Sequence, residues 1–249
     1  MYSFEGRVRY SECDEDGRLS LLGLVNYLQD CSTFQSQSLG IGLDFMAEHH
    51  FAWFISAWQI EIDELPRFFD PIVVSTWAYS MRRTQAGRCF TISSPEGRTY
   101  VQADSLWFVY DTEAKSPVRI PESQLAYAED TPRLDLPPTK RKLEVEGPYR
   151  ETRPVTIAEQ HLDTNRHVNN AQYIQLACDA LEELGEAFEP RRICVQYRQM
   201  ALLGDLVAPR VHRRQDGACV DLSDGGERSY AVVRLSRQGR TGARSPCGL

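Results

Sequence analysis

The strongest constraint on the fold is an internal repeat: one helix pattern followed by several strand patterns occurs twice along the chain of 249 residues. In the first half, apolar residues recur at the spacing of one helix face, at Leu21, Leu24, Val25, Leu28 and Cys31. The second half shows a similar helical spacing at Ala171, Ile174, Cys178, Leu181 and Leu184. Ser20 is a preferred N-cap residue, and Gly40 and Gly185 lie where the two helices are expected to end.

Strand-like runs surround both helix patterns. A short run precedes each helix, at residues 4–10 and 154–158. Longer runs follow the helices, at residues 58–62, 72–77, 89–92 and 99–110 in the first half and at 193–197, 206–211, 219–222 and 229–235 in the second. A helix packed on an antiparallel sheet, formed twice, predicts the α+β class. The two sheets can join edge to edge, which would cover strand edges that otherwise favour aggregation.

The spacing between equivalent turns defines the predicted units. The turns before the two helices are offset by 149 residues (163 − 14), whereas the late turns are offset by 129 residues (226 − 97). The second copy is therefore the shorter one. We predict an N-terminal unit over residues 1–131, a linker over 132–150, a C-terminal unit over 151–237 and a disordered tail over 238–249.

The composition excludes several classes of protein. The chain has 28 basic and 35 acidic residues, a net charge of −7, which argues against a dedicated nucleic-acid binder. No run approaches the roughly 18 apolar residues of a membrane span, and the N-terminus does not resemble a secretory signal. The seven cysteines include no C-x-x-C pair. We therefore predict reduced thiols, a cytoplasmic location, and neither a metal nor a cofactor.

The polar turn before the second helix holds the best candidates for chemistry. It reads Asp163-Thr164-Asn165-Arg166-His167-Val168-Asn169-Asn170, and the sequence contains no G-x-S-x-G, phosphate-loop, G-x-G-x-x-G or H-E-x-x-H signature. Asn169 and Asn170 fit the N-cap of a helix. A histidine can activate water, a carboxylate can set its tautomer, and an amide can hold the water or a carbonyl group. On chemistry alone, both catalysis by His167 and a purely structural turn remain open.

The amino-acid sequence of this turn resembles that of a known protein family. The run Leu162-Asp163-x-Asn165-x-His167-Val168-Asn169-Asn170-x-x-Tyr173 resembles the signature of the acyl-acyl-carrier-protein thioesterases. Further residues fall in the family's order, namely Arg9, Glu12, Asp14, Gly17, Trp53, Pro66, Thr76-Trp77, Arg88-x-Phe90, Ala103-x-Ser105-x-Trp107 and Asp111. The resemblance covers residues 4–235. It implies a tandem double-hotdog fold, in which two long helices are each wrapped by an antiparallel sheet and the sheets are joined.

The resemblance also implies an activity, which is the release of free fatty acid from acyl carrier protein during fatty acid biosynthesis. In the family's mechanism, His167 drives the attack of water on the thioester, Asn165 positions the thioester or the water, and Asp163 supports them. The start of a helix has free N–H groups and a partial positive charge. We therefore expect backbone N–H groups at the start of the second helix, those of Val168 or Asn169, to bind the oxyanion.

The implied partners are the carrier protein, with its phosphopantetheine thioester, and the fatty acyl chain. An acidic carrier protein calls for a basic surface, for which the sequence offers Arg82, Arg83 and Arg88, or Lys140, Arg141 and Lys142. An acyl pocket is expected in the first unit. Its candidate residues, each equally suited to plain core, are Trp53, Phe54, Trp58 and the helix face from Leu21 to Leu28. His161, close to the turn, is either a partner of Asp163 or a surface residue.

One departure from the family leaves alternatives open. Plant members carry an acidic residue and then a cysteine after the strand at 193–197, where this chain has Met200 and Ala201. Neither side chain can act as a base or a nucleophile. The alternatives are an acyl-coenzyme A thioesterase of the same fold, a non-catalytic acyl-binding hotdog protein, or dehydratase-like chemistry. Whether the fused pair forms a homodimer is also left open.

Overall fold

Both predicted helices form, and each begins at its predicted polar cap. The computed structural model describes residues 1–239. In helix α1 (Leu21–Ser38), the Ser20 hydroxyl accepts a hydrogen bond from the Gly23 N–H at 3.0 Å. In helix α3 (Asn170–Glu183), the Asn169 side chain accepts one from the Ala171 N–H at 2.9 Å. These caps satisfy N–H groups that have no partner within the helix.

The strands pair as one continuous antiparallel sheet within residues 1–239. They are β1 (Tyr2–Arg7), β2 (Phe51–Ile62), β3 (Pro71–Met81), β4 (Ala86–Ser93), β5 (Thr99–Asp111), β6 (Ser116–Val118), β7 (Arg150–Glu151), β8 (Val155–Thr156), β9 (Arg192–Tyr197), β10 (Leu206–Arg214), β11 (Gly217–Ser223) and β12 (Ser229–Ser236). The order across the sheet is β1-β3-β4-β5-β2-β9-β12-β11-β10-β7. The two halves meet where β2 pairs with β9, with Trp58 opposite Val195. The predicted edge-to-edge joint is thus confirmed.

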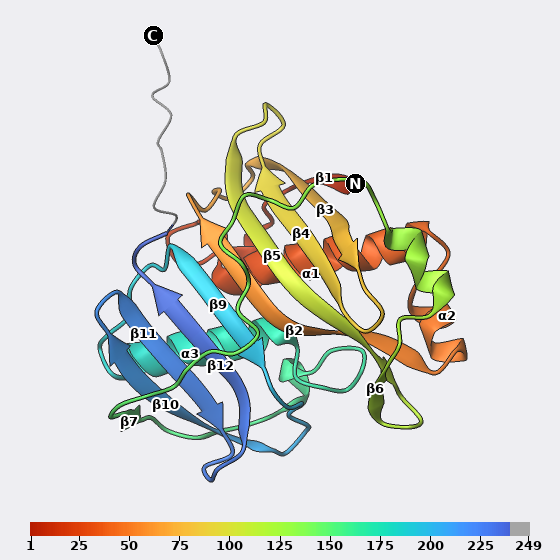
Figure 1. Ribbon diagram of the computed structural model, residues 1–249. Coiled ribbons are helices and arrows are strands. Elements are labelled where there is room, and N and C mark those ends of the chain that lie inside the picture. The colour runs from red at the N-terminus through yellow and green to blue at the C-terminus, as the bar shows by residue number, and fades with distance from the viewer. Residues whose placement is uncertain (240–249) are drawn as a thin grey trace.

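The two long helices pack on one side of this sheet, α1 behind the first half and α3 behind the second (Figure 1). A single core of buried apolar side chains runs through both halves and includes Leu24 and Leu28 of α1 and Ile174 and Leu181 of α3. The predicted α+β architecture is therefore confirmed, and the core leaves the opposite, polar flank of α1 available for a cavity.

The first half is longer than the second because β2 and β5 extend past the joint. The β2–β9 pairing covers only Ala57–Glu61 on β2, and a bulge near Ser56 precedes it. The first residues of β2, from Phe51 to Ile55, were not predicted as strand because they are continuously apolar and lack a period of two. The short helix α2 (Leu43–Glu48) was also not predicted. Conversely, the strand expected at 154–158 forms only as the short strand β8.

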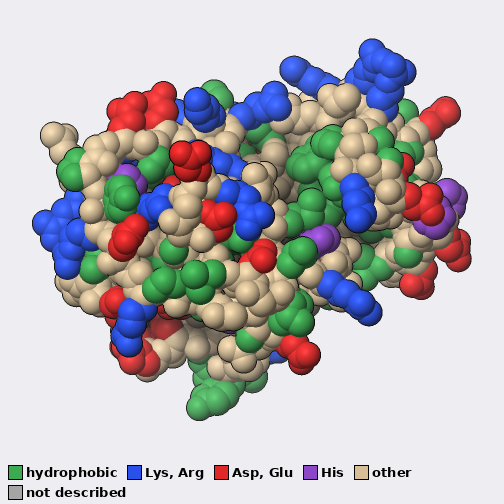
Figure 2. Space-filling model, turned by 90° about the horizontal axis from the view of Figure 1, so that it is seen from below, with side chains coloured by type: hydrophobic (Ala, Val, Ile, Leu, Met, Phe, Trp, Pro, Cys, Tyr) green, Lys and Arg blue, Asp and Glu red, His purple; other side chains and the backbone are tan. Residues whose placement is uncertain are grey.

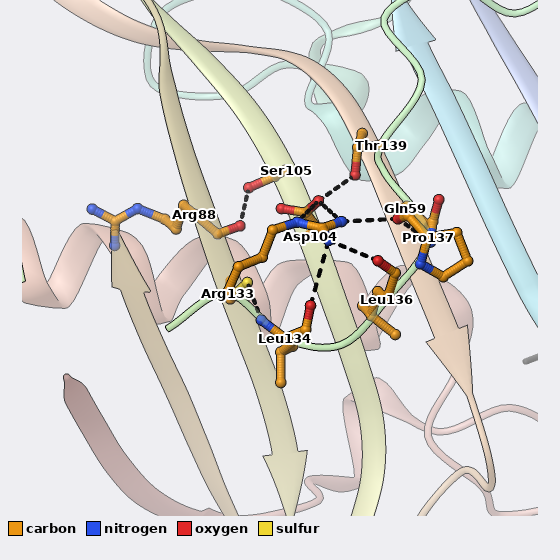
Figure 3. A network of polar contacts seen from close by, with 10 residues as sticks. Gln59, Arg88, Asp104, Ser105, Arg133, Leu134, Leu136, Pro137 and Thr139 are labelled. Atoms are coloured by element: carbon orange, nitrogen blue, oxygen red, sulfur yellow. Dashed lines mark hydrogen bonds and ion pairs between the residues drawn. The ribbon is translucent and has the colours of Figure 1, made fainter. Parts of the chain in front are cut away.

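The chain between the two halves crosses the face of the sheet that the helices leave uncovered (Figure 1). It is held there by a polar network in which the Arg133 guanidinium pairs with the buried carboxylate of Asp104 at 2.7 Å (Figure 3). Arg133 also donates to the backbone carbonyls of Leu136 at 2.7 Å and Pro137 at 2.8 Å, and the Thr139 hydroxyl donates to Asp104 at 2.7 Å. The segment is therefore fastened along its path.

The six cysteines of the described part are all unpaired. Within residues 1–239, no helix is both long and apolar enough to cross a membrane. The predicted tail at 238–249 falls almost wholly outside the described residues, as does Cys247.

Candidate active site

The turn before α3 is shaped by the Asp163 carboxylate. Its Oδ1 accepts hydrogen bonds from the backbone N–H groups of Asn165 at 2.8 Å and His167 at 3.4 Å. Arg166 adopts a left-handed backbone with φ of 60°, a region that disfavours residues with a side chain. Asp163 thus presents Asn165 and His167 side by side through their backbone.

The same turn occurs in the first half, without the same side chains. There Asp14 Oδ1 accepts from the N–H groups of Asp16 at 3.0 Å and Arg18 at 2.8 Å, and Gly17 takes the left-handed position with φ of 70°. Arg18, at the position equivalent to His167, forms an ion pair with Glu189 at 2.9 Å. The repeat therefore contains one turn with the candidate residues Asn165 and His167 and a second copy that lacks them.

His161 is the last residue of the short 3-10 helix (Glu159–His161) that precedes the Asp163 turn. Its Nδ1 accepts a hydrogen bond from the Ala158 N–H at 2.9 Å. In the first half, Glu12 Oε2 accepts from the Arg9 N–H at 3.1 Å in the same way. The His161 side chain therefore caps the start of the 3-10 helix and is not the partner of Asp163.

The His167 ring is half-buried and lies against the Phe54 ring, with 5.9 Å between ring centroids. Its Nδ1 is buried and has no hydrogen-bond partner among the described residues. The expectation that a carboxylate sets the tautomer of this ring is thus not met, because Asp163 bonds to the backbone instead. The ring lines the cavity described below, which leaves Nε2 as the nitrogen available to a substrate or water.

The two N–H groups predicted to bind the oxyanion, those of Val168 and Asn169, are not free to do so. The Val168 N–H donates to the Ala201 carbonyl at 3.1 Å, and the Asn169 N–H donates to the His161 carbonyl at 2.9 Å. Both groups are therefore already used within the described fold. The next N–H along the chain, that of Asn170 at the first position of α3, has no hydrogen-bond partner among residues 1–239.

The first half reaches across to hold the start of α3. The Gln29 side chain of α1 donates to Asn169 Oδ1 at 3.0 Å and accepts from Asn170 Nδ2 at 3.0 Å. Tyr197 of β9 donates to the Asn170 carbonyl at 3.0 Å, and Tyr173 of α3 accepts from the Ala201 N–H at 3.0 Å. Sequence reasoning missed Gln29 because it lies about 140 residues away from its partners, and no local pattern marks it.

A cavity of about 1000 Å³ runs from this turn into the first half, between α1, α2 and the sheet. Its apolar wall comprises Leu43, Met46, Phe51, Trp53, Phe54, Ile55, Met81 and Trp107. The opposite wall is polar and comes from α1, with Asn26, Gln29, Asp30, Ser32, Thr33 and Ser36. At the turn end it is lined by Asp163, Asn165, His167, Asn170 and Met200.

Two of the residues considered for an acyl pocket, Trp53 and Phe54, line this cavity. Trp58 does not, because it is buried in the core. The apolar face of α1 also faces the core, so that the cavity meets the polar flank of the helix instead. The first half thus supplies the cavity, and the second half supplies the turn at its end.

One of the basic residues expected on a surface for an acidic partner does not lie at the surface. Arg82, Arg83 and the residues at 140–142 are exposed, but Arg88 is buried and lines the cavity. On the face seen in Figure 2, Lys and Arg side chains lie among Asp and Glu side chains. No single basic patch dominates that view.

Two helix-on-sheet halves joined by one sheet, with an amide and an imidazole at the start of the second helix, define a double-hotdog protein. Family models for the N-terminal and C-terminal domains of acyl-ACP thioesterases match residues 1–127 and 150–236. The chain belongs to the acyl-ACP thioesterase family.

Individual relatives agree with this assignment. An acyl-[acyl-carrier-protein] hydrolase of Cuphea viscosissima, described as chloroplastic, is 25% identical over 207 residues, which are 77% of this chain and 50% of that protein. An oleoyl-acyl carrier protein thioesterase of Coriandrum sativum is 25% identical over 202 residues, which are 74% of this chain and 55% of that protein. The chain therefore spans about half the length of the curated relatives that it matches.

Solved structures show the same fold. An acyl-ACP thioesterase from Bacteroides thetaiotaomicron superposes with a TM-score of 0.81 at 23% identity, over 94% of this chain and 96% of that one. A 12:0-ACP thioesterase from Umbellularia californica also gives 0.81, at 17% identity, over 96% and 97%.

Proposed function

We propose that this chain hydrolyses the thioester of an acyl-acyl carrier protein and releases the free fatty acid. One observation carries the proposal: the turn with Asn165 and His167 lines the end of a largely apolar cavity that is built by the other half of the chain. An acyl chain can lie in that cavity while its thioester carbonyl reaches the imidazole. The family and the names of the curated relatives support the substrate class.

The residues suggest a direct attack by water. His167 Nε2 removes a proton from water, the water oxygen bonds to the thioester carbonyl carbon, and the carbonyl oxygen becomes an oxyanion. When the intermediate collapses, the carbon–sulfur bond breaks and the proton held by His167 passes to the departing thiolate. The Asn165 amide positions the water or the carbonyl, and Asp163 holds both residues through the backbone.

We assign the oxyanion to the Asn170 N–H. It is the first N–H of α3, it has no partner among the described residues, and Asn170 lines the cavity. The start of a helix carries partial positive charge, which favours a developing negative charge. The Asn170 side chain donates to Gln29 and the Asn170 carbonyl accepts from Tyr197, and these two bonds hold the residue in place.

Met200 lines the cavity but cannot move a proton, so another group must replace the family's acid if one is needed. Three carboxylates line the cavity, those of Asp30, Asp44 and Asp163. Asp163 is used by the turn. Asp30 is half-buried, makes no hydrogen bond or ion pair within residues 1–239, and has a pKa raised by burial, with Arg9 opposing the rise. We therefore propose Asp30, next to Gln29 on α1, as the second proton-transfer group.

Several finer assignments remain proposals. They are the carrier protein as partner in preference to coenzyme A, a cytoplasmic location, a homodimer and the unit limits at residues 131 and 151. A non-catalytic acyl-binding protein is the main competing reading, because Met200 stands where the family has its acid. The chain's retention of Asp163, Asn165 and His167 argues against it.

The test is release of free thiol from a panel of acyl-carrier-protein and acyl-coenzyme A thioesters. We expect turnover of the carrier-protein substrates, and a loss of about 10²-fold or more in His167→Ala, as for removal of a general base. Arg18→Ala, at the equivalent position of the structural turn, is the matched control and should retain activity. Equal rates for wild type and His167→Ala on every thioester would overturn the proposal and favour acyl binding without catalysis.

A further inference from the structure

The two edges of the large sheet are built differently. β1 forms one edge, and β10 with the short strands β7 and β8 forms the other (Figure 1). The offset of 149 residues between the two halves makes Glu5 of β1 equivalent to Pro154, which separates β7 from β8. Proline and short strands protect a sheet edge against pairing with another chain. β1 has no such break and runs without interruption over Tyr2–Arg7.

The outer side of β1 presents backbone groups that are free to pair. Val8, directly after the strand, donates its N–H to the Asp70 carbonyl at 3.1 Å, so the backbone of Val8 is bonded toward β3. These bonded positions alternate along an antiparallel strand. The N–H groups of Ser3, Glu5 and Arg7 therefore point away from β3, and none of them has an acceptor within residues 1–239.

The helices beside the two edges show the same contrast. In the second half, the Glu183 carboxylate of α3 accepts from the Arg153 N–H at 3.1 Å, so a charged side chain satisfies a backbone group of this edge. The equivalent residues of the first half are Phe34 and Phe4, whose ring centroids lie 5.3 Å apart. Phe34 is 45% exposed. The first half therefore presents an apolar side chain beside its free edge, where the second half has a charge.

A second exposed aromatic residue lies at the end of β1. Phe69 is 61% exposed, and the Arg7 guanidinium lies 4.4 Å from its ring centroid. Its backbone is left-handed with φ of 71°, which is costly for a residue with a side chain. The second half has Gly204 at this position, with φ of 85°. Both N–H groups make the equivalent bond at 2.9 Å, to the carbonyls of Val8 and Ile157. The first half therefore keeps an exposed ring at a position that favours glycine, as expected for a contact residue.

The charges on β1 select one way in which two copies of this edge can pair. In an antiparallel pair with two-fold symmetry, residues whose backbone points outward must lie opposite one another. An axis at Glu5 would place two carboxylates opposite each other, which is destabilising. An axis at Phe4 would place Glu5 opposite Ser3. An axis at Gly6 places Glu5 opposite Arg7 on both sides, and the missing side chain of Gly6 leaves room at the axis itself. Glu5 makes no hydrogen bond or ion pair in the described part of the chain.

We propose that this chain forms a homodimer in which the β1 edges of two copies pair antiparallel about a two-fold axis at Gly6. The N–H groups of Glu5 and Arg7 donate to the carbonyls of the partner's Arg7 and the partner's Glu5. The Arg7 carbonyl already accepts from the Tyr27 hydroxyl at 2.8 Å, and its second lone pair remains for this bond. Two reciprocal ion pairs form, and the exposed rings described above lie beside the joint. The inference does not depend on the proposed activity, because β1 does not line the cavity.

Sedimentation equilibrium of the full chain measures both the mass and the dissociation constant of the dimer. We expect the mass of two chains for the wild type. Glu5→Arg and Arg7→Glu each place like charges opposite one another at both pairs, and each should weaken the dimer about 10-fold or more. The double variant Glu5→Arg/Arg7→Glu restores opposite charges and should recover most of the affinity. Glu227→Arg is the control, because Glu227 is exposed, lies in the turn before β12 and makes no ion pair within residues 1–239.

Glu5→Pro tests the backbone contribution. It removes an outward N–H without removing a bond to β3, and it reproduces the Pro154 of the other edge. We expect the mass of a single chain with an unchanged circular dichroism spectrum. A wild type that stays a single chain at every concentration would overturn the proposal. A dimer that the double variant fails to restore, or one that both charge reversals leave intact, would refute pairing at Gly6, and this comparison decides even where Glu5→Pro does not fold.

Discussion

Breaking the ion pair between Arg133 and Asp104 should destabilise the fold strongly, and this change gives the sharpest test of how the linking segment is held. Asp104 is 1% exposed, and the Arg133 side chain is 27% exposed. Replacing Arg133 by methionine would leave the buried carboxylate with only neutral partners, the hydroxyls of Thr139 and Tyr79. It would also free the Leu136 carbonyl and leave the Pro137 carbonyl with Gln59 as its one donor. Removing one partner of a buried pair costs about 3–5 kcal/mol. We expect the lower end, about 3 kcal/mol, because Arg133 is partly solvated.

Equilibrium unfolding in urea measures this change. The control is Arg153→Met, because Arg153 pairs with Glu183 at the surface with 86% of its side chain exposed, and such pairs contribute about 0–1 kcal/mol. In Arg133→Met, proteases should also cleave more rapidly between residues 128 and 149. A loss below about 1 kcal/mol, with unchanged cleavage, would refute the argument and show that water replaces the guanidinium at little cost.

Three further predictions concern the site. Asn170→Pro removes the proposed oxyanion N–H at a helix position that tolerates proline; its kcat should fall about 10²-fold below that of Asn170→Ala, and equal rates would exclude this donor. Asp30→Asn should lower kcat, yet stabilise the fold at neutral pH. Folding raises the pKa of Asp30, so the native protein binds this proton more tightly than the unfolded chain, and the stability of the wild type falls as pH rises from the unfolded to the folded pKa. Unfolding midpoints measured across that pH range should show that the stability advantage of Asp30→Asn over wild type grows with pH. A difference that does not change with pH would contradict the argument. Arg166→Gly should relieve the left-handed backbone and stabilise by about 0.5–1 kcal/mol in thermal unfolding, whereas destabilisation would show that the Arg166 side chain contributes contacts.

Much of the fold could be predicted because local chemistry determines it. The apolar spacing and Ser20 marked α1, and Asn169 marked the start of α3. The offset between turns also revealed the two halves, because the Asp14 and Asp163 turns share one backbone pattern. Periodicity did not identify the first residues of β2, because they are continuously apolar and show no alternation.

The sequence by itself determined the repeat, the helices with their caps, and the turn that presents Asn165 and His167, since each depends on residues close together in the chain. Only the tertiary structure decided what surrounds that turn. The Val168 N–H donates to the carbonyl of Ala201 in a distant segment, Gln29 comes from the other half, and Arg88 is buried in the cavity instead of lying on the surface. Hydrogen bonding and burial between distant segments depend on how the two halves pack together, and no local sequence pattern determines that packing.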